Sequence, residues 1–283
     1  MAVDVQDLHI DIGGREIVGG VSLTVADGER VGLIGSSGSG KSMISKALLG
    51  LLPAESTIRG DIALGDMVVA SAGRVGRDAQ GSRDKRTDGD GTGYAVSDQQ
   101  LADLRGRYVG TVFQNPAATL NPVWTVAKQV ALPLRLHYNL PKADRLERVM
   151  AMLRKVGLPE EVAGKYPCEL SGGQQQRVGL ATALITSPRF IIADEPTTAL
   201  DSITQRQIVD LLVSLVDDAG ASMLFITHDF SVLARATTRC YVLDEGRVVE
   251  EGDTMRLLAD PKTEQTTRLV EAARMLTLEV HHD

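Results

Sequence analysis

The segment Gly35–Ser42, GSSGSGKS, constrains this chain more than any other part of its sequence. It follows Arg30–Ile34, an apolar run typical of a strand, and it precedes Met43–Leu52, where apolar residues recur at helical spacing up to Pro53. A glycine-rich loop between a strand and a helix turns backbone N–H groups inward, beside the positive end of the helix dipole. Such loops bind phosphate groups, so this order predicts a nucleotide site in an α/β fold.

The residue types in this loop suit contacts with a nucleoside triphosphate. Gly38 and Gly40 let the backbone approach phosphate oxygens, and the Lys41 ammonium can reach the β- and γ-phosphates. The Ser42 hydroxyl can ligate Mg²⁺. The flanking strand and helix argue against a chance Gly/Ser-rich turn. We therefore expect the whole segment to bind nucleotide: Gly35, Ser36, Ser37, Gly38, Ser39, Gly40, Lys41 and Ser42.

Strand and helix patterns alternate along the rest of the chain. Val21–Val25 and Arg30–Ile34 flank a turn at Asp27-Gly28, which favours a hairpin. Short apolar runs typical of strands are Phe190–Ala193, Met223–Thr227, Tyr241–Leu243 and Arg247–Val249. Helical apolar stripes contain Leu146, Val149, Met150 and Leu153; Val178, Ala181, Leu184 and Ile185; and Ile208, Leu211, Leu212 and Leu215. This alternation predicts an α/β fold with a mainly parallel sheet.

Composition excludes several classes of protein. The net charge is −7, with 30 Lys+Arg against 37 Asp+Glu, and aromatic residues make up only 4% of the chain, so we expect no nucleic-acid partner. The lone Cys168 and Cys240 give neither a disulfide framework nor metal-ligand spacing. The acidic N-terminus does not resemble a signal peptide, and no apolar run reaches the ~18–20 residues that span a bilayer. We expect a soluble, cytoplasmic protein.

The segment 71–93 differs from the rest of the chain because it is rich in glycine and in charges of both signs. Val75 is its only large apolar residue, so it cannot repay its ordering entropy by burial. We interpret it as a flexible, solvated insertion. The alternative is a docking element for a partner.

A second motif, Leu170–Gln174 or LSGGQ, combines two loop glycines with Ser171, a suitable N-cap for the helical sequence that follows. The motif therefore predicts a second helix whose N-terminus faces a phosphate group. With both motifs in place, the chain resembles the ATP-binding-cassette (ABC) ATPases over about Val3–Gly252. The resemblance implies their P-loop NTPase fold: a mainly parallel sheet core, an N-terminal antiparallel β part and an inserted α-helical subdomain.

The resemblance also assigns roles to single residues. Gln114, in VFQNP, matches the Q-loop glutamine, which contacts Mg²⁺ or the attacking water and senses the transmembrane partner. Asp194 and Glu195, in FIIADE, match the aspartate that holds Mg²⁺ and the glutamate that polarises the nucleophilic water. Asp201 matches the D-loop aspartate, and His228 matches the switch histidine that contacts the γ-phosphate.

Members of this family work as pairs, and the LSGGQ loop of one subunit completes the ATP site of the other. The resemblance therefore implies ATP and Mg²⁺ as cofactors and a second cassette, identical or distinct, as partner. The expected catalytic residues are Glu195, His228, Gln114 and Lys41, and the expected Mg²⁺ ligands are Ser42, Gln114 and Asp194. Ser171, Gly172, Gly173, Gln174 and Asp201 are expected to contact nucleotide across the dimer.

The expected organisation is one ABC ATPase domain over residues 1–255, followed by a short helical tail over 256–283. Its core would comprise about 1–113 and 171–255, and its helical subdomain about 115–170.

Two further stretches resemble the peptide/nickel importer branch: FQNPAATLNPVWTV and the tail VVEEGDTMRLLADPKTEQTTRLV. This implies an ATP-hydrolysing subunit at the cytoplasmic face of the membrane, with two polytopic permease subunits and, indirectly, an extracytoplasmic solute-binding protein. Peptide is the expected substrate; nickel, another small solute or an exporter remain alternatives. A soluble ABC ATPase of repair or translation fits less well, because the chain has neither a long heptad segment nor a second cassette.

One position departs from the family pattern. The family usually places an aromatic residue, which stacks on adenine, a few positions before the strand that corresponds to Val21–Val25, and the residue in register here is Ile12. No Phe, Tyr or Trp occurs between Met1 and Gly35. Adenine would then be held by weaker aliphatic packing, or by an aromatic residue from elsewhere in the chain, and we expect reduced base selectivity.

Overall fold

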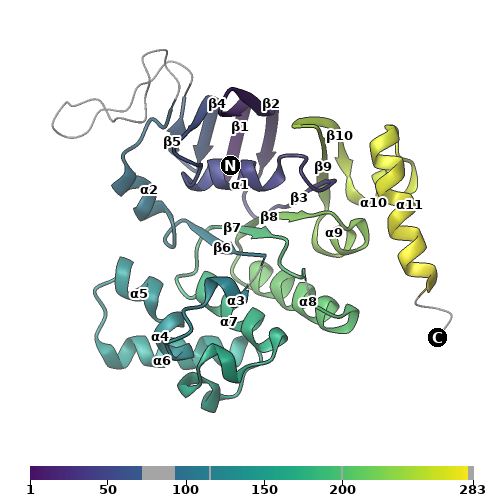
Figure 1. The fold of residues 1–283 in the computed structure, drawn as a ribbon. Coiled ribbons are helices and arrows are strands. Elements are labelled where there is room, and N and C mark those ends of the chain that lie inside the picture. Colours follow the sequence, from purple (N-terminus) through teal and green to yellow (C-terminus); the bar gives the residue numbers. More distant parts are fainter. Residues whose placement is uncertain (72–92, 115, 199, 280–283) are drawn as a thin grey trace. The chain divides into compact units, whose positions relative to one another are not determined.

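The protein is described by a computed structural model covering residues 1–71, 93–114, 116–198 and 200–279 (Figure 1). All but the two end residues of the expected insertion 71–93 lie outside these ranges. The chain forms two compact units, one made of Met1–Ala102 with Leu224–Asp283 and the other of Asp103–Met223. It passes from one unit to the other within α2 (Asp98–Leu104) and returns within β8 (Ser222–Thr227).

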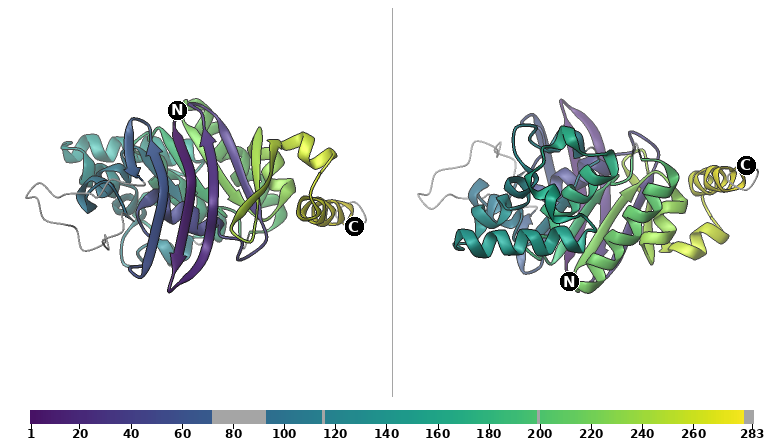
Figure 2. Two further views of the ribbon diagram at one scale, coloured as in Figure 1. Left: turned by 90° about the horizontal axis from the view of Figure 1, so that it is seen from above. Right: turned by 90° about the horizontal axis from the view of Figure 1, so that it is seen from below.

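An antiparallel sheet forms the N-terminal part of the first unit. Its strands are β1 (Val3–Ile12), β2 (Arg15–Val25), β4 (Ser56–Leu64) and β5 (Met67–Ala70), in the order β2-β1-β4-β5. Figure 2 (left) shows β2, β1 and β4 running side by side, with antiparallel pairing throughout. This confirms the expected antiparallel β part.

Strand β1 contains a bulge that its sequence pattern reflects. Val3 and Val5 are buried at odd positions, whereas Leu8 and Ile10 are buried at even positions. The phase changes at Asp7, which adopts a φ of 49°, and the pairing with both neighbouring strands shifts there. The extra residue turns the second half of the strand so that its apolar side chains still face the core.

A second sheet in this unit contains β3 (Arg30–Gly35), β9 (Arg239–Asp244) and β10 (Arg247–Asp253) together with β8, in the order β10-β9-β3-β8. Strand β3 is parallel to β9, and β9 and β10 form an antiparallel hairpin. Both turn residues of the hairpin, Glu245 and Gly246, have positive φ, at 44° and 78°. That geometry matches the right-handed twist of paired strands.

The predicted hairpin between Val21–Val25 and Arg30–Ile34 is wrong. The first segment ends β2 in the antiparallel sheet, and the second forms β3 in the other sheet. The turn between them is real, since the Glu29 amide bonds to the Ala26 carbonyl at 3.1 Å. Strand β3 is buried almost throughout, so its pairing with distant β9 outweighs the local turn.

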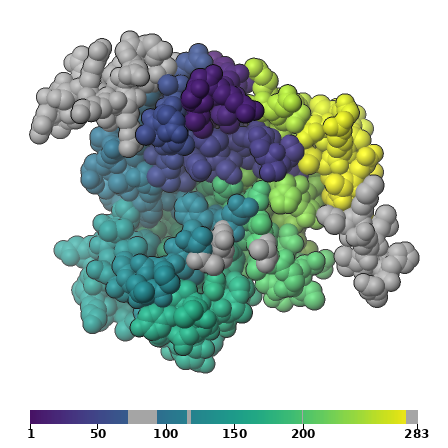
Figure 3. Space-filling model, in the orientation of Figure 1, coloured from purple at the N-terminus to yellow at the C-terminus, as the bar shows by residue number. Residues whose placement is uncertain are grey.

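The helices that lie wholly within the described part of this unit are α1 (Lys41–Leu49), α9 (Phe230–Ala236), α10 (Thr254–Ala259) and α11 (Glu264–Glu279). Helix α1 ends at Gly50, whose φ is 66°, and so stops before the predicted terminator Pro53. Helix α11, yellow in Figure 3, forms part of the unit's outer surface and buries one face that includes Thr266, Val270 and Ala273.

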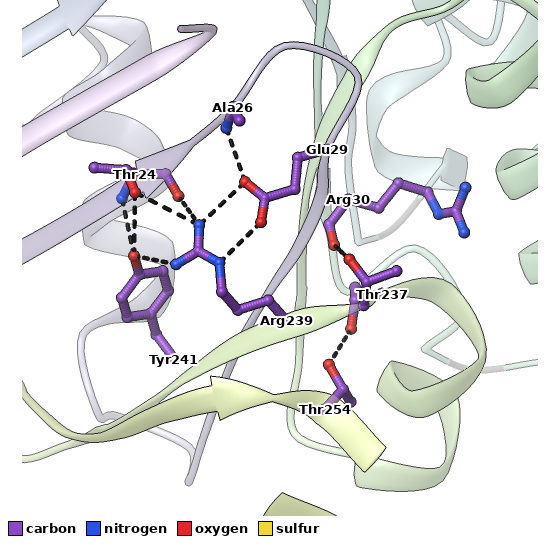
Figure 4. A network of polar contacts seen from close by, with 9 residues as sticks. Thr24, Ala26, Glu29, Arg30, Thr237, Arg239, Tyr241 and Thr254 are labelled. Carbon is purple, nitrogen blue, oxygen red and sulfur yellow. Dashed lines mark hydrogen bonds and ion pairs between the residues drawn. The ribbon is translucent and has the colours of Figure 1, made fainter. Parts of the chain in front are cut away.

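A network around Arg239 ties the start of β9 to the β2–β3 turn (Figure 4). The guanidinium donates to both carboxylate oxygens of Glu29, at 2.8 and 3.1 Å, and to the Thr24 carbonyl at 2.8 Å. It also donates to the Tyr241 hydroxyl. The hydrogen bonds from Arg239 lower the pKa of Glu29. The ion pair therefore stabilises the fold mainly while Glu29 is ionised.

The second unit has two paired parallel strands, β6 (Val109–Val112) and β7 (Phe190–Asp194). Between them the chain forms α3 (Pro116–Thr119), α4 (Val126–Val130), α5 (Leu132–His137), α6 (Lys142–Lys155), two 3-10 turns (Glu160–Gly164 and Pro167–Glu169) and α7 (Gly172–Leu184). Helix α8 (Ser202–Asp218) follows β7.

The predicted apolar stripes of this unit are largely confirmed. In α6, Val149 and Leu153 are buried, but Leu146 is 51% exposed. In α8, Ile208 and Leu212 are buried. Among the described residues, none of the helices combines the length and apolar character needed to cross a membrane.

Candidate functional site

The glycine loop lies between β3 and α1, as its sequence context predicts. Gly38 and Gly40 have φ values of 81° and 103°. Residues with a side chain rarely adopt such backbone conformations. At Gly35 a Cβ atom would lie 2.2 Å from the Leu243 carbonyl oxygen, so only glycine fits beside β9. Left-handed backbone conformations of this kind are typical of loops that turn N–H groups toward an anion.

The Lys41 side chain folds back into this loop. Its Nζ donates to the carbonyl oxygens of Gly35 and Ser36, both at 2.8 Å, and lies 3.4 Å from the Ser39 hydroxyl. Lys41 is only 5% exposed, so its charge is concentrated inside the loop. A buried ammonium among backbone dipoles favours an anion with several oxygens.

The glycine loop also forms a hydrogen bond with the β9–β10 turn, which lies about 200 residues later in the chain. The Gly246 amide, in the β9–β10 turn, donates to the Ser39 carbonyl at 3.0 Å. The Gly246 carbonyl accepts from the Gly19 amide at 3.0 Å. At its other end the loop leads into α1, whose N-cap residue, Gly40, has no side chain with which to cap the first N–H groups of the helix.

In the second unit, Gln114 and Glu195 meet. Val112 in β6 pairs with Ala193 in β7, and each of the two polar residues follows two positions later. The Gln114 Nε2 donates to the Glu195 Oε2 at 3.0 Å. The equal offset from paired residues explains the contact, because carboxyl ends of parallel strands share one sheet edge.

Glu195 has an unusual backbone conformation for a residue with a side chain, with φ at 47°. Its Oε2 accepts a second hydrogen bond, from the Thr198 hydroxyl at 3.0 Å. Asp194 ends β7 and is half-buried. Strain of this kind is common where a side chain must point in a fixed direction.

Ser171 is the N-cap of α7, as predicted. Its Oγ accepts from the Gln174 amide at 3.3 Å, and the Gln174 Oε1 accepts from the Ser171 amide at 3.0 Å. This reciprocal capping box fixes the turn at which Gly172 and Gly173 begin the helix. Because the Ser171 hydroxyl accepts from the backbone, its own hydrogen points elsewhere and suits donation to an anion.

The remaining predicted residues lie at helix starts. Asp201 caps α8, with its Oδ1 accepting from the Ile203 and Thr204 amides at 3.1 and 3.0 Å. The hydrogen bond from the Thr204 amide is the main reason for the lowered pKa of Asp201. His228 is exposed between β8 and α9, beside Asp229, which caps that helix.

The predicted Mg²⁺ ligands offer the hard oxygen donors that this ion prefers. Ser42 presents an exposed hydroxyl at the start of α1, and Asp194 a carboxylate at the end of β7. Gln114 uses its amide nitrogen on Glu195, so its amide oxygen is the atom that suits a cation. The donor chemistry of all three residues therefore fits Mg²⁺.

A cavity of about 190 Å³ lies in the second unit. One of its lining residues, Phe113, directly precedes Gln114 in the chain. Its walls include Phe113, Trp124, Leu132 and Gln176. Gln176 is 2% exposed, and its Nε2 has no hydrogen-bond partner among the described residues. Sequence reasoning missed this cavity, and it also missed Thr198, although Thr198 stands only three positions after Glu195 in the ADEPTT run.

The chain is similar to known proteins in both sequence and fold. The ABC transporter family model matches residues 18–198. A putative peptide import ATP-binding protein of Brucella abortus (strain 2308) is 38% identical over 260 residues, covering 90% of this chain and 72% of the relative. A probable peptide ABC transporter ATP-binding protein of Sinorhizobium fredii (strain NBRC 101917 / NGR234) is 36% identical over 278 residues, covering 95% and 76%.

Among solved structures, the dimeric post-hydrolysis state of an ATP-binding cassette bound to ADP and Pi is similar to this chain. It has a TM-score of 0.72 and 29% sequence identity, and the match covers 89% of this chain and 98% of that one. This chain thus matches cassettes in both sequence and fold, and it contains the glycine loop, the LSGGQ helix start and the carboxylates at the end of β7. The chain therefore belongs to the ABC transporter family, as one of its ATP-binding cassettes.

Proposed function

We propose that this chain is the ATP-hydrolysing subunit of a peptide importer and works at the cytoplasmic face of the membrane. The observation that carries the ATP-binding part is the Lys41 ammonium, buried among the carbonyls of the glycine loop at the start of α1. The names of the relatives from Brucella abortus and Sinorhizobium fredii support peptide as the substrate.

In the proposed reaction the protein positions groups and stabilises charge as water attacks the γ-phosphorus and ADP leaves. Loop amides and Lys41 hold the phosphates, and Glu195 polarises the attacking water from its fixed position beside Gln114. Mg²⁺, held by Ser42, Asp194 and Gln114, would neutralise charge on the phosphate oxygens. His228 would contact the γ-phosphate.

A second cassette would complete each site. We propose that Ser171 and Gly173 of one subunit donate to the γ-phosphate bound by the other, with Gly172, Gln174 and Asp201 lining the same interface. The Ser171 hydroxyl accepts from the Gln174 amide and so can use its own hydrogen for donation, which supports this role. The dimeric form of the similar cassette bound to ADP and Pi is consistent with pairing.

We propose that the cavity lined by Phe113, Trp124 and Gln176 receives part of a permease subunit. Phe113 in its wall is 44% exposed, and Val123, between the lining residues Asn121 and Trp124, is 74% exposed. Exposed apolar side chains around a hollow are typical of partner surfaces. The buried Gln176 Nε2, without a partner among the described residues, suits an acceptor supplied by that subunit.

Co-purification tests this docking site. Val123→Asp should abolish recovery of the permease subunits while leaving ATP binding unchanged. The matched control is Leu146→Asp, since Leu146 is an exposed apolar residue of the same unit outside the cavity wall. Equal recovery with both variants would exclude the cavity as the docking site.

Transport assays test the function itself. A deletion strain should lose uptake of labelled peptide, and the wild-type gene should restore uptake while a Glu195→Gln gene should not. Loss of nickel uptake instead would favour the metal branch, and substrate accumulation inside the deletion strain would favour an exporter. Each outcome assigns a different cargo or direction to the same ATPase.

A further inference from the structure

Glu195 is held by two contacts from one nearby residue. The Thr198 hydroxyl donates to the Glu195 Oε2 at 3.0 Å, and the Thr198 amide donates to the Glu195 carbonyl at 3.3 Å. The first contact fixes the side chain, and the second closes the turn that carries it. Both contacts support a residue whose φ is 47°, a backbone conformation that persists only where its surroundings hold it.

The neighbouring threonine behaves differently. Thr197 is 6% exposed, and its hydroxyl accepts from the Gln205 Nε2 at 3.2 Å, which ties it to α8. Thr198 is exposed, and its hydroxyl is aimed at the carboxylate. The two residues therefore have the same side chain one position apart, one tied to a helix and the other to Glu195.

The chemistry of the contact favours a positioning role. A carboxylate can only accept, so the Thr198 hydroxyl must donate, and the Gln114 Nε2 donates to the same oxygen from β6. A glutamate side chain has three rotatable bonds. The rate of a reaction that it catalyses falls when its carboxylate is not held in the reactive position. Two donors on one oxygen restrict that rotation far more than either donor alone.

We propose that Thr198 is the positioning residue for Glu195, holding its carboxylate in line for the attacking water. The proposal rests on the proposed role of Glu195 in hydrolysis. Thr198 itself contacts neither ATP nor water in this scheme. Its hydroxyl should therefore affect the rate of the chemical step and leave nucleotide binding unchanged.

Steady-state hydrolysis by the full chain tests this. Thr198→Val keeps the shape but removes the donor, and kcat should fall about ten- to a hundredfold, the range seen when supporting hydrogen bonds are removed. KM and ATP affinity should stay within about twofold. Thr198→Ser restores the hydroxyl and should recover at least about half of the wild-type kcat.

Two controls separate the possible failures. Thr197→Val removes a hydroxyl one position away and should leave kcat nearly unchanged; a loss equal to that of Thr198→Val would overturn the proposal, because loop geometry would then be the cause. In a Glu195→Gln background, Thr198→Val should cause little further loss, because both act through one group. Additive losses would also overturn it. Normal turnover in Glu195→Gln would refute the proposed role of Glu195. Normal turnover in Thr198→Val together with lost turnover in Glu195→Gln would refute only the positioning role of Thr198.

Discussion

Gln114 donates a hydrogen bond of 3.0 Å to Glu195, a residue 81 positions later in the chain. Both follow paired strand residues at the same offset, so the register of β6 against β7 sets their contact. A slip of one residue in that register would turn one of the two side chains to the other face of the sheet. The strand pairing thus determines the geometry of the proposed catalytic carboxylate.

Glu195→Gln should retain ATP binding but reduce hydrolysis by about 10²- to 10⁴-fold, the usual contribution of a general base. The amide keeps the shape of the side chain but cannot take a proton from water. Because ATP then remains bound, the variant should also accumulate as a dimer. Single-turnover hydrolysis and size-exclusion chromatography with ATP measure both effects, and unchanged turnover would refute the assignment.

Lys41→Ala should weaken ATP binding by at least about thirtyfold, since it removes a buried charge from the loop that is proposed to hold the phosphates. The control is Lys46→Ala, which removes an exposed lysine from the same helix α1. Titration with a fluorescent ATP analogue measures both affinities. Similar affinities for the two variants would mean that Lys41 serves only to shape the loop.

Ile12→Tyr should strengthen ATP binding by roughly two- to tenfold, as expected for an added aromatic stack. Ile12 ends β1, paired with Arg15 and Ser56, and is half-buried. The wild-type chain should discriminate poorly between ATP and GTP, and the variant should favour ATP. Competition binding with both nucleotides tests this; an equal gain for ATP and GTP would contradict the predicted loss of base selectivity.

Arg239→Met should lower the free energy of unfolding by about 1–3 kcal/mol, because it leaves the partly buried Glu29 without its main partner. The pKa of Glu29 is lowered in the folded chain, mainly by Arg239, so the stabilisation is fully present above the ordinary value of 4.5. It is lost as the pH falls through the folded pKa. The difference between variant and wild type should therefore shrink below about pH 4.5.

Denaturant unfolding at a series of pH values measures this difference. Arg59→Met is the control, since Arg59 forms a 3.3 Å ion pair with Asp11 but its side chain is 53% exposed. Exposed pairs contribute about 0–1 kcal/mol. An equal loss in both variants would show that the Arg239 network contributes no more than a surface ion pair.

Local patterns in the sequence predict much of the fold. The apolar runs at Phe190–Ala193 and Met223–Thr227 are strands, and Ser171 caps a helix as its residue type indicates. The hairpin across Asp27-Gly28 was wrong because strand pairing depends on distant partners, here β9 for β3. The division into a core and a helical subdomain over about 115–170 stays a prediction.

The site is predictable where a residue belongs to a motif, and less so where geometry decides. Lys41 and Ser171 follow from their motifs, which carry backbone requirements that show in the sequence. The Thr198–Glu195 contact depends on the positive φ of Glu195, which no pattern of residue types predicts. The Gln114–Glu195 contact needs the register of two strands far apart in the chain, which propensity does not encode.

The hydrogen bond between Gly246 and Ser39 has a consequence for biosynthesis. The glycine loop leaves the ribosome early, but the turn that holds it, and strand β9 beside it, are translated near the end of the chain. At about 5–20 residues per second, the intervening chain takes on the order of 10 to 40 s to synthesise. A nascent chain stalled before Gly246 would therefore expose a loop without its final support, and ribosome-bound fragments should bind nucleotide only once that turn has emerged.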